Sequence, residues 1–198
     1  NFIMVKILHR VNTLEELNKV DKLYGVEVDV HAYGEKLIVH HNAFENGPAL
    51  SDWLSLCGDR LVIFNIKEEG IEGQVREMVL ESGVTNFMLL DLSFPALMKM
   101  TNMGESRVAI RISEYESVEN ALLLESKIDW VWLDCFKGFP LSAEEFQILR
   151  SSSYKICLVS PELHGLPRDK NDIYSFQKIM ETIGAEVDAV CTKFPELW

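Results

Sequence analysis

The chain has 198 residues, of which 47% are hydrophobic, so it can bury a substantial core, and its length gives no reason to expect more than one domain. Its formal net charge of -12 excludes strong attraction to nucleic acids or acidic membrane surfaces, since no Lys/Arg cluster reverses the sign locally. No apolar run reaches the roughly 20 residues that span a bilayer, and the first residues do not resemble a signal peptide. We therefore predict a single cytoplasmic domain over 1–198 without nucleic-acid or membrane partners; the oligomeric state is left open.

Short apolar runs alternate along the chain with segments of helical periodicity. Thr13 and Glu16, like Ser142 and Glu145, have the spacing of capping boxes and predict two helix starts. The predicted strands are 7–10, 25–32, 37–41, 61–67, 87–92, 107–113, 129–136, 155–160 and 188–194. The predicted helices are 13–24, 50–54, 71–83, 94–103, 118–127, 142–149 and 172–184.

This regular alternation predicts the fold. Continuously apolar strands are buried on both faces, which favours parallel pairing with helices as crossovers. A compact (β/α)8 TIM barrel is the simplest α/β architecture with these elements, and 37–41 would be a hairpin extension of the second strand. An open doubly wound sheet is the alternative. No strand is followed by a GxGxxG or GxxxxGK[ST] motif, which weakens that alternative.

Two carboxylates on one strand are the first indication of a site. Side chains alternate along a strand, so Glu27 and Asp29 share one face. Placing two like charges side by side costs free energy unless a cation or a basic group neutralises them. The sequence is therefore compatible with a metal site or with a salt-bridge network in which Arg10, Lys67 or Arg111 is the partner.

Other ionisable residues also come where predicted strands end. Active sites of TIM barrels lie at the carboxyl ends of the strands, so residues at these ends would face one site. The residues in this position include His9, Arg10, Glu27, Asp29, His41, Asn65, Lys67, Asp91, Arg111, Asp134 and Lys193.

The order of these residues resembles the glycerophosphodiester phosphodiesterase family, within the phosphatidylinositol-phospholipase-C-like barrel superfamily. The resemblance rests on His9-Arg10, Glu27-x-Asp29, His41-Asn42, Asn65-Ile66-Lys67 and the run 190–195, and it extends over essentially the whole chain. It implies a (β/α)8 barrel that hydrolyses a small phosphodiester with the help of a divalent cation, Mg²⁺ or Ca²⁺.

The resemblance also implies roles for single residues. His9 and His41 would be the acid–base pair, and Glu27, Asp29 and Asn65 the metal ligands. Arg10, Lys67, Arg111 and Lys193 would contact the anionic substrate. The chemistry agrees, because His titrates nearest neutral pH and carboxylate oxygens suit hard cations.

Four positions depart from the family pattern. Val11 replaces a glycine, and Asn42, Asn65 and Lys193 each replace a carboxylate. The change at Asn65 removes one negative charge from the metal site, and Asp91 is the candidate to replace it. We interpret the chain as a divergent member with its own substrate. Two alternatives stay open: a non-catalytic barrel that binds a phosphorylated ligand, and lyase-type chemistry that yields a cyclic phosphate.

The remaining histidines, tryptophans and cysteines predict structure more than chemistry. His40 alternates away from His41 and is assigned no role. His164 in the loop 161–167 is expected to be a solvated loop residue, with a substrate contact as the alternative. The four cysteines lack CxxC spacing and are predicted to be reduced, buried thiols. Trp53, Trp130 and Trp132 are expected to pack in the core.

Overall fold

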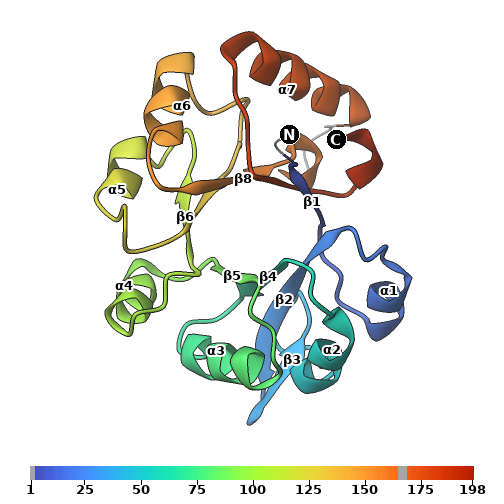
Figure 1. Cartoon of the computed structure of the whole chain (residues 1–198). Helices are drawn as coiled ribbons and strands as arrows, with labels where there is room; N and C mark the ends of the chain where they lie inside the picture. Colours follow the sequence, from blue (N-terminus) through green and yellow to red (C-terminus); the bar gives the residue numbers. More distant parts are fainter. Residues whose placement is uncertain (1–2, 165–168) are drawn as a thin grey trace. The chain divides into compact units, whose positions relative to one another are not determined.

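The computed structural model describes residues 3–164 and 169–198, and it shows strands alternating with helices (Figure 1). The strands are β1 (Val5–Leu8), β2 (Gly25–Tyr33), β3 (Lys36–Val39), β4 (Val62–Ile66), β5 (Phe87–Leu90), β6 (Ala109–Ile112), β7 (Trp130–Leu133), β8 (Lys155–Val159) and β9 (Ala189–Thr192). The helices are α1 (Leu14–Lys19), α2 (Leu50–Cys57), α3 (Glu72–Glu81), α4 (Phe94–Asn102), α5 (Val118–Leu122), α6 (Ala143–Arg150) and α7 (Lys170–Ile183), with short 3-10 turns η1 (Pro161–His164) and η2 (Pro195–Leu197).

The order of the strands identifies the fold class. The sheet runs β5-β4-β2-β1-β9-β8-β7-β6, and β3 pairs only with β2. Along this order the parallel strands follow one another as in the chain, and β1 also lies beside β9, the last strand. Between β5 and the residue before β6 there is only an isolated parallel bridge among the described residues, Leu89 to Val108. A doubly wound sheet reverses its strand order part-way and does not make its first and last strands neighbours. The chain therefore has the predicted α/β fold of the (β/α)8 TIM-barrel class.

The chain divides into two compact units, which we describe separately. The N-terminal unit is Ile7–Val108, and the C-terminal unit combines Asn1–Lys6 with Ala109–Trp198. In the N-terminal unit, β2 pairs in parallel with β1 and β4 and antiparallel with β3. Helix α1 packs beside α2, which also contacts β3 (Figure 1). The hairpin predicted from the turn residues at 33–36 is confirmed.

The core of the N-terminal unit is aromatic. The Phe64 ring on β4 makes edge-on contacts with Trp53 and Phe87, each with ring centroids 6.0 Å apart. The strands approach one another closely at Gly25, where a Cβ atom would lie 2.8 Å from the Leu61 carbonyl oxygen. Glycine is needed there because any side chain would push β2 away from the residues that precede β4.

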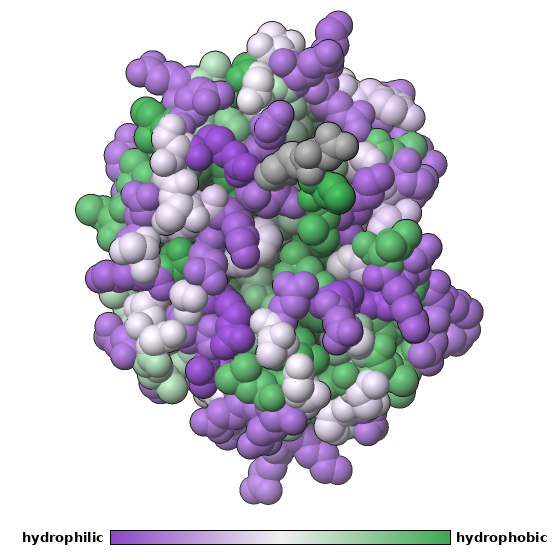
Figure 2. Space-filling model, viewed as in Figure 1, coloured by the Kyte–Doolittle hydropathy of each residue, from purple (hydrophilic) through white to green (hydrophobic). Residues whose placement is uncertain are grey.

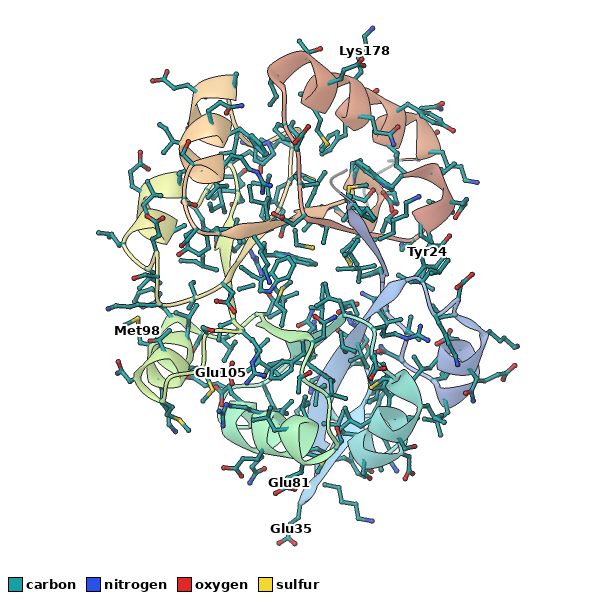
Figure 3. The ribbon with its side chains drawn as sticks, in the orientation of Figure 1. Tyr24, Glu35, Glu81, Met98, Glu105 and Lys178 are labelled. Atoms are coloured by element: carbon teal, nitrogen blue, oxygen red, sulfur yellow. The ribbon has the colours of Figure 1, made fainter. Side chains whose placement is uncertain are left out.

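The N-terminal unit also contains a buried ion cluster, in which Glu105 contacts Arg76 and Arg107. Glu105, labelled in Figure 3, is only 1% exposed. It accepts hydrogen bonds from Arg76 Nε at 2.6 Å and Arg107 Nε at 2.7 Å. Burial opposes ionisation of Glu105, but the bonds from Arg107 and Arg76 outweigh it and lower the pKa of this carboxyl to about 2.

The C-terminal unit contains β6 to β9, which pair in parallel in chain order. All four strands are apolar and mostly buried, as expected for strands covered on both faces.

The residues predicted to be structural are buried in both units. Trp53 is fully buried, and Trp130 and Trp132 are each 6% exposed. All four cysteines are buried free thiols: Cys57, Cys135, Cys157 and Cys191.

The capping boxes are present, but several helix bounds differ from the prediction. Thr13 and Ser142 both accept the expected backbone N–H and cap α1 and α6. Helix α1 ends at Lys19, five residues before the predicted end, because Val20 adopts an extended conformation. Helix α7 begins at Lys170, two residues before the prediction, because Asp169 is its N-cap.

The face shown in Figure 2 is mainly hydrophilic, and hydrophobic residues form smaller groups on it. Among the described residues, none of the helices combines the length and apolar character required to cross a bilayer.

Candidate active site

The two carboxylates predicted to share a face lie together in the N-terminal unit. Glu27 and Asp29 on β2 are each 1% exposed. The register places Asp29 beside Asn65 of β4, and both strands run parallel to β1, so their carboxyl ends meet at one edge with that of β1. The residues following β1 and β3 supply the rest of the group.

Asp29 is surrounded by basic and amide groups. Its Oδ2 atom accepts a hydrogen bond from Asn12 Nδ2 at 2.8 Å and lies 3.1 Å from His41 Nδ1. Arg10 Nε is 3.7 Å from the same oxygen, and Lys67 Nζ is 3.6 Å from Oδ1. The negative charge of Asp29 is therefore compensated by side chains of the unit.

Glu27 has fewer partners. Its Oε2 atom accepts the backbone N–H of Arg10 at 2.7 Å and lies 3.7 Å from His9 Nε2. Burial and the adjacent Asp29 carboxylate raise the pKa of Glu27 to about 8, although the Arg10 N–H, the Asn65 amide and Lys67 partly offset this effect. Glu27 is thus a buried carboxyl that needs a nearby positive charge to ionise fully.

Backbone geometry helps to assemble this group. Arg10 has a positive φ of 57°, which is uncommon for a residue other than glycine. This conformation accompanies the hydrogen bond from its N–H to Glu27. The next residue, Val11, is buried and donates its N–H to the Glu27 carbonyl at 2.8 Å, so the end of β1 is held against β2.

His41 is oriented from two sides. Its Nδ1 faces Asp29, while Arg10 Nη2 lies 3.3 Å from Nε2. Its backbone carbonyl lies 3.2 Å from Nε2 of the buried His31. A carboxylate at Nδ1 favours the tautomer that carries its proton there, which leaves Nε2 as the basic nitrogen. His40, in contrast, pairs with Glu45 at 3.3 Å.

The donor atoms fit a hard divalent cation. Asn65 Oδ1 is buried and has no hydrogen-bond partner within residues 3–164 and 169–198. Such an atom is costly to bury unless something positive is bound to it. Together with the Glu27 carboxylate it offers oxygen ligands of the kind that Mg²⁺ and Ca²⁺ prefer, and Asp29 can contribute a third. The contacts of Asp29 with Arg10 and Lys67 are those of the salt-bridge network that the sequence also allowed.

Arg111 and Lys193, predicted to contact substrate, belong to the C-terminal unit. Arg111 lies on β6, with Nε 3.7 Å from Asp134 Oδ2. Lys193 follows β9, is exposed, and donates its backbone N–H to Glu162 Oε1 at 2.9 Å. Their role in substrate binding stays a prediction.

Two residues differ from what the sequence suggested. Asn12 was not predicted, yet it both donates to Asp29 Oδ2 and accepts the Asp29 N–H at 3.0 Å; its position two residues after Arg10 at a strand end was the available signal. His164 is not a solvated loop residue, since its ring contacts the buried Asp134. Residues 165–167 of the predicted loop lie outside the described residues.

Comparison with known proteins gives structural matches only. No family model and no curated protein matches the sequence. The fold, however, is that of solved phosphodiesterases. A glycerophosphoryl diester phosphodiesterase from Parabacteroides distasonis matches with a TM-score of 0.69 and 11% identity over 98% of this chain and 84% of its own.

A second crystal structure, of a protein from Agrobacterium tumefaciens, also carries the name glycerophosphoryl diester phosphodiesterase. It matches with a TM-score of 0.68 and 12% identity over 98% of this chain and 96% of its own. At this level of identity the comparison establishes a shared fold, and activity has to be argued from the site.

Proposed function

We propose that this chain is a metal-dependent phosphodiesterase that hydrolyses a small glycerophosphodiester-like molecule, with His9 and His41 as acid and base. The observation that supports this most is the arrangement of two histidines beside two buried carboxylates, with His9 3.7 Å from Glu27 and His41 3.1 Å from Asp29. The fold shared with the two solved phosphodiesterases agrees with it.

The side chains suit phosphodiester cleavage. One group must take a proton from the attacking hydroxyl or water, and another must give a proton to the leaving alkoxide. His41, held at Nδ1 by Asp29, presents Nε2 for one of these transfers, and His9 is available for the other. Arg10 and Lys67, which are 46% and 23% exposed at their side chains, can turn from Asp29 to the phosphate oxygens.

Glu27, Asp29 and Asn65 would hold the cation. A bound divalent cation stabilises the negative charge that develops on the phosphate. Asn65 contributes a neutral oxygen, so this ligand set carries one negative charge fewer than one with three carboxylates. We therefore expect weaker cation binding than such a site would give, and dependence of activity on added Mg²⁺ or Ca²⁺.

Turnover of glycerophosphodiesters tests the proposal. The purified chain is incubated with a panel of these diesters and Mg²⁺, Mn²⁺ or Ca²⁺, and products are separated by chromatography. We expect turnover that His9→Ala and His41→Ala each reduce by about 10² to 10⁴, the usual contribution of a general acid or base.

His40→Ala is the matched control, because His40 neighbours His41 in the chain but pairs with Glu45. It should retain wild-type turnover. Equal activity of wild type and His9→Ala on every diester would contradict the proposal. Appearance of a cyclic phosphate as the final product would instead indicate lyase-type chemistry.

A non-catalytic phosphate-binding barrel is a second candidate. It is favoured by the pairing of Asp29 with Arg10, His41 and Lys67, which neutralises this carboxylate without a metal. Calorimetric titration distinguishes the two: a non-catalytic chain would bind phosphate compounds in the presence of a chelator and release no product.

A further inference from the structure

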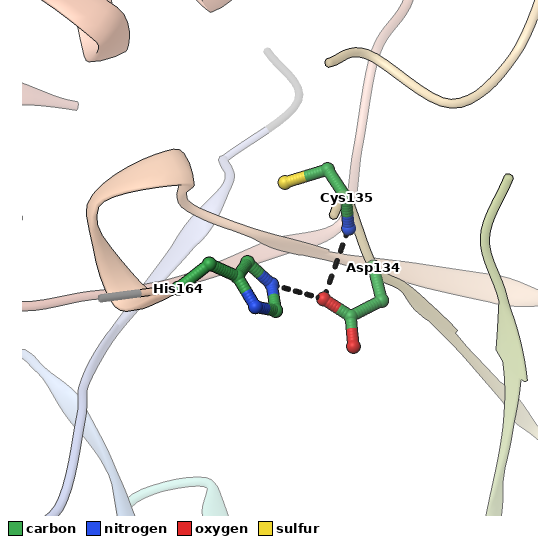
Figure 4. A group of neighbouring side chains, drawn as sticks. All are labelled: Asp134, Cys135 and His164. Carbon is green, nitrogen blue, oxygen red and sulfur yellow. Dashed lines mark hydrogen bonds and ion pairs between the residues drawn. The ribbon is translucent and has the colours of Figure 1, made fainter. Parts of the chain in front are cut away.

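A second group of polar side chains lies in the C-terminal unit, and none of its members belongs to the proposed acid–base and metal site. Asp134, directly after β7, is 4% exposed. Its Oδ1 atom accepts the Cys135 N–H at 2.9 Å and lies 2.5 Å from His164 Nε2 (Figure 4). Arg111 Nε lies 3.7 Å from Oδ2. A buried carboxylate is thus held between an imidazole and a guanidinium.

A metal site is one interpretation of this group, because ligand atoms of Asp134, Cys135 and His164 all lie within 4.8 Å of one another. The contacts argue against it. The 2.5 Å between His164 Nε2 and Asp134 Oδ1 shows direct contact, whereas two ligands of one Zn²⁺, each about 2.0 Å from it, lie farther apart. Cys135 Sγ donates to the Val159 carbonyl at 3.3 Å, and the nearby Arg111 would repel a cation.

The imidazole of His164 is fixed in orientation. Asp134 engages Nε2, so a ligand of this imidazole would bind at Nδ1. The Phe136 ring packs on the imidazole with centroids 4.9 Å apart. Phe136 is itself held, because Glu114 accepts the backbone N–H groups of Phe136, Lys137 and Gly138 at 2.9, 2.7 and 3.0 Å.

The two basic side chains remain accessible. The side chains of Arg111 and His164 are 34% and 18% exposed, while Asp134 behind them is buried. The Arg111 guanidinium carries a positive charge, and the His164 ring lies on the same carboxylate. Guanidinium and imidazolium N–H groups donate charge-assisted hydrogen bonds, which bind tetrahedral oxyanions well.

We propose that Arg111 and His164, positioned by Asp134, form an oxyanion site that binds a phosphate group. Phe136 and the exposed Tyr115, whose rings lie 6.0 Å apart, provide an apolar border on one side. Its residues are not those of the proposed acid–base and metal group. Arg111, for which the family resemblance implies only a substrate contact, would here bind phosphate together with His164.

Binding of inorganic phosphate tests this proposal. The full chain carrying Arg10→Ala and Lys67→Ala is used, so that the proposed active site adds little to the signal. The imidazole NMR signal of His164, assigned by its loss in His164→Gln, should shift with saturation as phosphate is added. Arg111→Gln should weaken the affinity by about tenfold or more, as expected for loss of a charge-assisted hydrogen bond.

His40→Gln is the matched control, since His40 pairs with the exposed Glu45. It should leave phosphate affinity unchanged. Arg111→Lys, which keeps the charge, should lose less affinity than Arg111→Gln. A parallel titration with glycerol 3-phosphate shows whether free phosphate or a phosphomonoester binds better, and circular dichroism checks folding.

Two results would overturn the proposal. One is a His164 signal that does not move with millimolar phosphate, or that moves equally in the Arg111→Gln protein. The other is tight Zn²⁺ binding that Cys135→Ser abolishes while Cys157→Ser does not, which would identify a metal site. Loss of diester turnover in His9→Ala has no bearing on either result.

Discussion

At the scale of single residues, burial decides what a charged side chain does. Glu27 and Glu105 are both 1% exposed, yet the pKa of one is raised to about 8 and that of the other is lowered to about 2. Glu105 has two arginines within 2.7 Å, whereas Glu27 faces a second carboxylate. The arginines around Glu105 stabilise the fold. The negative charge of Glu27 is not fully compensated, and a bound cation can compensate it.

Glu105→Gln should destabilise the protein at pH 7 by about 2 to 4 kcal/mol, because it leaves Arg76 and Arg107 without a buried counter-charge. A lowered pKa means that the carboxylate stabilises the fold fully above its ordinary value of 4.5 and loses this effect as the pH falls to about 2. The difference between variant and wild type should therefore shrink over that range.

Urea unfolding at a series of pH values measures this difference. Glu35→Gln is the control, since Glu35 is exposed in the turn between β2 and β3 and should change the free energy of unfolding little (Figure 3). A difference between Glu105→Gln and wild type that does not depend on pH would contradict the prediction.

At the scale of elements, capping chemistry fixes where helices begin more firmly than periodicity fixes where they end. The Ser142 side chain accepts the Glu145 N–H at 3.2 Å, and the Glu145 carboxylate accepts the Ser142 N–H at 2.8 Å. Such reciprocal bonds satisfy two otherwise unpaired donors. The ends of α1 and α5 depend on the turns that follow, and no comparable sequence motif predicts where these turns begin.

Ser142→Ala should lower the free energy of unfolding by about 1 kcal/mol, because α6 loses its side-chain cap. Ser117→Ala is the matched change, since Ser117 is the N-cap of α5 but makes no cap hydrogen bond from its side chain. We expect it to cost only a few tenths of a kcal/mol, roughly the effect of an ordinary surface substitution. Equal losses in chemical denaturation would show that the cap bond does not stabilise α6.

At the scale of the whole molecule, β1 contributes residues to both units. Val5 donates its N–H to Asp188 of the C-terminal unit at 2.9 Å, while Ile7 and Leu8 pair with β2 of the N-terminal unit. We expect the bonds of this four-residue strand to both units to be lost together on unfolding. The single domain over 1–198 stays a prediction.

We therefore expect cooperative unfolding. In Trp53→Phe the remaining tryptophans lie outside the N-terminal unit, so fluorescence follows the C-terminal unit while circular dichroism follows both. The two transitions in urea should coincide. Separate midpoints would indicate that the two units unfold independently.

The sequence alone determined the α/β class, the two capping boxes and the shared face of Glu27 and Asp29, because these depend on local periodicity and spacing. The tertiary structure decided what surrounds those carboxylates. That Asn12 bonds to Asp29, that Arg10 and Lys67 compensate it, and that His164 meets Asp134 30 residues away are long-range contacts, which no local pattern contains. Whether two carboxylates bind a cation or a basic side chain depends on such contacts, since the free energy of a buried charge is set by the atoms that replace water around it.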